Sequence, residues 1–157
     1  MLILEGDWDG AISSGQEASR LLPGSADVWA VLAHNYSFSG EPDLALSAIS
    51  RAMELSPGHP DFYHWIKGRV HRLKGEWDLA IDSLSIGMEN GAPSVVQLVE
   101  LVAAYSAAGR DQEALRTGTE IKRIAPGFKA SEWVSHPAMK DPEKQSLEFE
   151  LLSKAGL

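Results

Sequence analysis

Residues 40–57 read GEPDLALSAISRAMELSP, and the outline of this stretch occurs four times in the 157-residue chain. Each copy has a glycine, an alanine five residues later and a closing proline; the other copies lie at 6–23, 75–93 and 109–126. The opening glycines are spaced 34, 35 and 34 residues apart: Gly6, Gly40, Gly75 and Gly109. A period of about 34 residues is typical of stacked helical hairpins, because one hairpin cannot bury its apolar stripe alone. The sequence therefore predicts an all-α repeat protein.

The stretch 42–55 has the pattern of a helix that buries one face. Its apolar residues recur at the spacing of a helical stripe: Leu44, Ala45, Ala48, Ile49, Ala52 and Met53. Pro42 suits the first helical position because it has no N–H to leave unpaired, and Pro57 ends the helix. The segment 26–39 predicts the partner helix, which ends at Gly40 because glycine can take the left-handed conformation that closes a helix.

On these residues the sequence resembles the tetratricopeptide repeat (TPR) family. In residues 26–57 the family's W, L, G/A, Y, G, A, A and P positions are filled by Trp29, Leu32, Ala33, Tyr36, Gly40, Ala45, Ala52 and Pro57. The resemblance covers roughly 6–126 and implies a right-handed superhelical solenoid of helix-turn-helix hairpins. We expect a partial first repeat, three full repeats and a capping segment: 1–23, 24–57, 58–93, 94–126 and 127–157.

The last segment has the features of a cap. We expect a short helix around Trp133, a break at His136-Pro137 and a final helix that starts at Asp141-Pro142. An apolar stripe of Leu147, Leu151 and Leu152 and a stop at Gly156 complete the pattern.

The tail also resembles the C-terminal TPR region of bacterial class III adenylate/guanylate cyclases and related multidomain regulators. The matching residues are Trp133, Lys140, Asp141, Pro142, Lys154, Ala155, Gly156 and Leu157. In such proteins the repeats regulate or recruit. The chain also opens on LILEG, only the tail of a first helix, so we expect the C-terminal piece of a larger bacterial protein. A short natural protein with an irregular cap is the alternative.

Composition narrows the functions open to this chain. Its formal charge of −8 argues against non-specific nucleic-acid binding, which needs dense Lys and Arg. Cysteine is absent, so no thiolate nucleophile or cysteine-based zinc site is available. The most apolar stretch, 95–109, is shorter than a membrane span, and the start of the chain lacks the features of a signal peptide. We expect a cytoplasmic protein with no catalytic residue, cofactor or metal; a metal shared by His64 and His71 is conceivable but disfavoured by their spacing.

The TPR resemblance implies that the first helix of each pair lines a partner-binding groove. Carried over by position, the lining residues are Asp27, Ala30, His34, Ser37 and Phe38, then Phe62, Trp65, Arg69, Arg72 and Leu73, then Val96, Val99, Ala103, Ser106 and Ala107. We expect His34, Phe38, Trp65, Arg69 and Arg72 to carry recognition of a protein or peptide with acidic and apolar groups, since Arg and Trp are common at binding hot spots.

Three alternatives remain open at this point. Trp65 could pack against a neighbouring repeat while the arginines solvate an exposed face. The apolar pattern of Tyr63, Ile66, Val70 and Leu73 allows a second register, in which His64, His71 and Arg72 face the groove. The uncovered first half-repeat could also dock on another copy, which would make the chain a self-association module.

Overall fold

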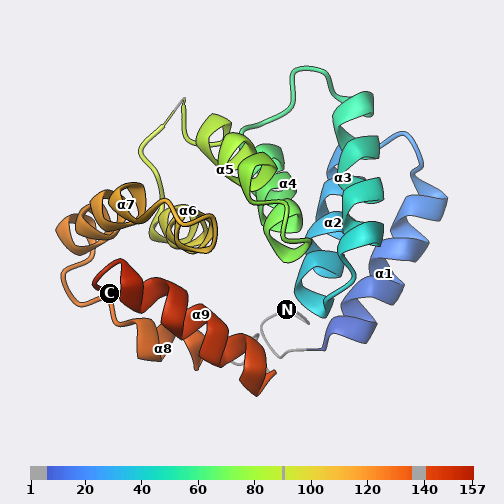
Figure 1. Cartoon of the computed structure of the whole chain (residues 1–157). Helices are drawn as coiled ribbons and strands as arrows, with labels where there is room; N and C mark the ends of the chain where they lie inside the picture. Colours follow the sequence, from blue (N-terminus) through green and yellow to red (C-terminus); the bar gives the residue numbers. More distant parts are fainter. Residues whose placement is uncertain (1–6, 90, 136–140) are drawn as a thin grey trace. The chain divides into compact units, whose positions relative to one another are not determined.

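The computed structural model describes residues 7–89, 91–135 and 141–157. Within these residues the chain is all-helical and contains no strand (Figure 1). Its helices are α1 (Trp8–Leu21), α2 (Ala26–Ser39), α3 (Pro42–Leu55), α4 (Phe62–Leu73), α5 (Trp77–Ile86), α6 (Val95–Ala107), α7 (Asp111–Ile124), α8 (Ala130–Val134) and α9 (Pro142–Lys154). They fall into two compact units, an N-terminal unit of Met1–Gly87 and a C-terminal unit of Met88–Leu157.

In the N-terminal unit, α2 pairs with α3 and α4 pairs with α5 (Figure 1). Helix α1 packs on α2, and α4 packs on both α2 and α3. The repeated alanines are covered by this packing: Ala45 and Ala80 are fully buried and Ala11 nearly so. Gly40 ends α2 with a φ of 87°, a conformation that only glycine adopts without strain. Both observations confirm the helical hairpins expected from the sequence.

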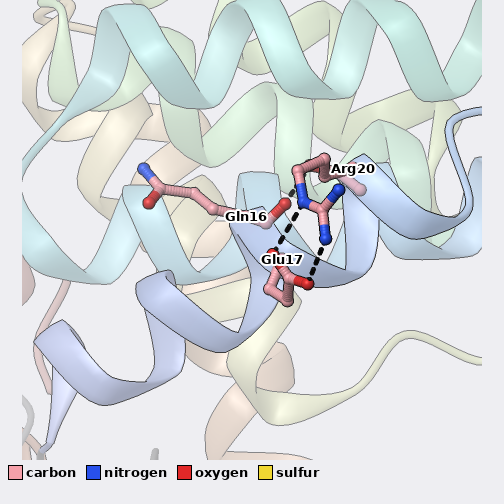
Figure 2. Close-up of polar contacts among 4 residues, drawn as sticks. Gln16, Glu17 and Arg20 are labelled. Carbon is pink, nitrogen blue, oxygen red and sulfur yellow. Dashed lines mark hydrogen bonds and ion pairs between the residues drawn. The ribbon is translucent and has the colours of Figure 1, made fainter.

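Polar side chains join α1 to its neighbour. Gln16 Nε2 donates to Tyr36 Oη (2.9 Å), and the buried Asn35 donates through Nδ2 to the carbonyl of Ala11 (3.1 Å). Figure 2 shows Gln16 directed away from the adjacent Glu17–Arg20 pair. That pair is bidentate, with N–O distances of 2.9 and 2.6 Å, but both side chains are exposed. Water and salt screen such a pair, so the buried contacts of α1 hold it in place.

In the C-terminal unit, α6 pairs with α7, and α9 packs on α6, α7 and α8. Ser94 caps α6 through a reciprocal capping box with Gln97. The final helix starts as expected, since the Asp141 side chain accepts from the backbone N–H of Glu143 (3.0 Å) and Pro142 follows at the first helical position. Gly156 has a φ of 75° and marks its end.

Two apolar residues that the sequence places on buried stripes are in fact exposed. Leu44 on α3 is 49% exposed and Leu147 on α9 is 54% exposed. On α9 the next residue, Glu148, is buried instead, together with Leu151 and Leu152. Helix α9 packs on three neighbours, and these contacts set which of its faces is buried. The expected break at His136-Pro137 and the opening LILEG lie outside the described residues.

Gly118 on α7 lies against the end of α9. A Cβ atom at this position would stand 2.4 Å from the carbonyl oxygen of Ala155 and 3.2 Å from the Ala155 Cβ. The obstructing oxygen belongs to the backbone, so it cannot rotate away as a side chain would. Glycine at 118 therefore permits the close docking of α9, which its low helix propensity alone does not explain.

We predict that Gly118→Ala destabilises the protein by about 1–3 kcal/mol, because the cost of overpacking exceeds the gain in helix propensity. Urea unfolding followed by circular dichroism measures this change. Thr119→Ala is the matched control, since Thr119 is exposed on the same helix, and it should be nearly neutral. A Gly118→Ala protein as stable as wild type would show that α9 does not dock this closely.

Candidate protein-binding face

Four of the five residues expected to bind a partner meet on one surface of the N-terminal unit. His34 and Phe38 lie one turn apart on α2, and Trp65 and Arg69 lie one turn apart on α4. Residues four apart share a helix face, and α2 packs against α4, so the two pairs face each other. All four side chains are partly exposed.

The contacts among these side chains are close. The Arg69 Cζ lies 3.9 Å from the centre of the Phe38 ring, which is a cation–π contact. The His34 ring lies 4.7 Å from Phe38 and 5.7 Å from Trp65, centre to centre. Such contacts contribute about 0.5–2 kcal/mol each, and they hold the arginine in a defined place.

Sequence reasoning missed Trp8, the first residue of α1. Its ring stacks on Phe38 at 5.3 Å with an angle of 15° between the planes. The expectation counted only the first helix of each hairpin, and Trp8 belongs to the second helix of the partial repeat. Its signal is positional: Trp8 stands three residues before Ala11, as Trp77 stands three residues before Ala80. We call the five residues Trp8, His34, Phe38, Trp65 and Arg69 the aromatic–arginine face.

Arg69 supplies a positive charge to the face, whereas His34 does not. The pKa of His34 is lowered to about 4, first because the ring is buried and then because the Arg69 cation lies nearby; the Asn35 side chain acts in the opposite direction. His34 is therefore neutral at pH 7. Trp65 Nε1 is buried and has no hydrogen-bond acceptor among the described residues. The face thus combines apolar rings with the positive charge of Arg69.

Other expected lining residues lie elsewhere. The small residues at these positions are covered by their neighbours and do not line a surface: Ala30, Ser37, Val99, Ala103 and Ser106 are buried. Arg72 lies near the end of α4 and is partly exposed, and its role in binding stays a prediction.

The structure distinguishes between the two registers considered for α4. Trp65 and Arg69 point toward α2, as the register counted from Gly75 requires. His71 is buried, with its Nδ1 2.6 Å from the Glu76 carboxylate, so it does not belong to the face. Tyr63, Ile66 and Val70 are buried as the second register proposed, so its apolar pattern describes the core side of the helix.

No group of three or more His, Cys, Asp or Glu side chains that could hold a metal ion occurs in the part of the chain that the structure describes. None of the described helices is long and apolar enough to cross a membrane.

The lowered pKa of His34 predicts a pH-dependent stability. The unfolded chain binds a proton at His34 below about pH 6.5, whereas the folded chain resists protonation until about pH 4. The free energy of unfolding should therefore fall as the pH drops through this window, by at most about 3 kcal/mol from this residue. Urea unfolding of wild type and His34→Gln at several pH values isolates the effect. From pH 7 to 4.5 the free energy of unfolding should fall more for wild type than for His34→Gln. An equal fall in both proteins would contradict a buried neutral His34.

Comparison with known proteins identifies the fold. No protein-family model matches the chain. A crystal structure of MamA aligns with 98% of this chain and 90% of its own, with a TM-score of 0.69 and 20% sequence identity. A second crystal structure of MamA aligns with 98% of this chain and 84% of its own, with a TM-score of 0.68 and 20% identity. A structure described as "MamA RS-1 ArsTM double mutant" covers 99% of this chain and 88% of its own, with a TM-score of 0.69 and 14% identity. At these identities the likeness concerns the fold, and it confirms that the chain is an all-α helical-repeat protein of the TPR type.

Proposed function

We propose that this chain is a protein-interaction module that recognises its partner through the aromatic–arginine face. The observation that carries the proposal is the convergence of Trp8, Phe38 and Trp65 with Arg69 on one partly exposed surface. Trp, Tyr and Arg are the residues most enriched at the energetic centres of protein interfaces.

The chemistry of the face favours a partner that presents a carboxylate beside an apolar side chain. The Arg69 cation attracts a carboxylate, and the neighbouring rings offer an apolar contact. Because His34 is neutral at pH 7, it adds no second cation. The face is therefore suited to one acidic group rather than to a run of them.

Self-association is the second candidate. The end of α1 and the adjoining turn expose Leu21 and Leu22, at 61% and 58%, and the outer side of α2 exposes Val31 at 52%. These side chains could meet a second copy of the chain. Sedimentation that depends on protein concentration, and its loss in Leu21→Glu/Leu22→Glu, would favour this candidate.

The regulatory context is a further part of the proposal. The link to an upstream catalytic domain of the cyclase type is supported only by the tail residues around Trp133 and Asp141-Pro142, and a cytoplasmic location only by composition. The gene sequence upstream of Met1 tests the first.

The main proposal is tested with displayed random peptides. Peptides selected on wild-type protein should be enriched in Asp or Glu next to Trp, Phe, Leu or Ile. Arg69→Gln should weaken the binding of a selected peptide by about 10- to 100-fold, the cost of losing one charge-assisted contact, as measured by fluorescence anisotropy. Binding should also weaken moderately as salt is added.

Arg51→Gln is the matched control, because Arg51 is exposed on α3 and pairs with Glu54 outside the face. It should bind the peptide as wild type does. Melting temperatures of all three proteins separate binding from folding. Equal binding by Arg69→Gln, or selected peptides without acidic residues, would refute the proposal.

A further inference from the structure

A pair of histidines lies outside the aromatic–arginine face. His59 is in the loop before α4, and His64 is in the first turn of that helix. Their Nε2 atoms are 3.0 Å apart, and their ring centres are 4.8 Å apart. Both residues are partly exposed.

The surroundings of His59 determine which of its nitrogens has a free electron pair. Its Nδ1 lies 3.0 Å from the backbone carbonyl of Ser56. A carbonyl only accepts, so Nδ1 carries the proton and the Nε2 of neutral His59 presents a lone pair toward His64. A histidine whose Nδ1–H donates to a backbone carbonyl has the arrangement that orients metal ligands in proteins.

Packing fixes the position of the His59 ring. The ring stacks on Tyr63 at 5.5 Å with 24° between the planes. Tyr63 is itself 1% exposed, and its hydroxyl donates to Asp27 Oδ1 (2.8 Å). Pro60 restricts the backbone that follows His59. The lone pair therefore points in a direction set by the core of the N-terminal unit.

We propose that His59 and His64 form a two-imidazole site for a divalent late transition metal, with Cu²⁺ preferred. In the absence of metal, the 3.0 Å gap between the two Nε2 atoms holds a single N–H, donated by His64. Metal binding replaces this proton, and His64 moves its proton to Nδ1. Water molecules complete the coordination, because the described residues offer no third His, Cys, Asp or Glu ligand.

The ligand type indicates which metals fit. Imidazole nitrogens suit Cu²⁺, Ni²⁺ and Zn²⁺, whereas Mg²⁺ prefers oxygen ligands. The Irving–Williams order also places Cu²⁺ above Ni²⁺.

The test uses the full chain without a histidine tag, titrated with Cu²⁺, Ni²⁺, Zn²⁺ or Mg²⁺ alone. The chain has no cysteine, so no thiol competes for the metal. We expect one Cu²⁺ per chain by calorimetry, weaker Ni²⁺ and Zn²⁺, and no Mg²⁺. The electron paramagnetic resonance spectrum of the Cu²⁺ complex should show coupling to two nitrogens. Binding should weaken as the pH is lowered, because protons compete for the same lone pairs.

His59→Ala and His64→Ala should each weaken Cu²⁺ binding by at least about tenfold. In each variant the spectrum should show coupling to one nitrogen fewer. His136→Ala is the matched control and should leave both unchanged; His71 is unsuitable because it is buried against Glu76. Circular dichroism verifies that the variants are folded. An unchanged Cu²⁺ affinity in either His59→Ala or His64→Ala, or a wild-type spectrum with coupling to one nitrogen, would overturn the proposal.

Discussion

The structure depends on one steric constraint, the close packing of the two helices of each hairpin around a small residue. Ala45 and Ala80 have no exposed surface and Ala114 almost none, so each lies where its hairpin is closely packed. A larger side chain there would force the helices apart and open the core, because protein interiors are too closely packed to absorb the added volume. The spacing of these alanines sets the spacing of the hairpins, and the hairpins set where every other side chain lies.

The same constraint explains why the N-terminal unit offers a binding face. Helices α2 and α4 are held close enough for residues on their facing turns to touch, so Phe38 and Arg69 meet although they are 31 residues apart in sequence. In the C-terminal unit the corresponding helix, α6, packs on α7 and α9. Its residue Val99 belongs to the apolar core of that unit, and Ala103 is buried. One repeat pattern thus produces a surface in one unit and a buried helix in the other.

Much of this could be predicted from the sequence because it depends on local chemistry. Gly40 and Pro42 define the turn between α2 and α3, and counting positions along the repeat brought His34, Phe38, Trp65 and Arg69 together. The failures come from tertiary packing. Glu148 is buried where Leu147 was expected, since α9 contacts several neighbours and its inward face cannot be read from hydrophobicity. Trp8 was missed because its contact is with another helix, and the proximity of His59 to His64 depends on how the loop turns before α4.

The cation–π contact between Arg69 and the Phe38 ring has a consequence for the rate and the selectivity of ligand binding. A free arginine samples many rotamers, and ordering it on association costs up to about 2 kcal/mol. Here that ordering occurs when the chain folds, so the guanidinium is preorganised before any encounter. Affinity would then be governed by the fit of the incoming group, and a mismatched ligand could not be accommodated by swinging the arginine aside without giving up its aromatic support.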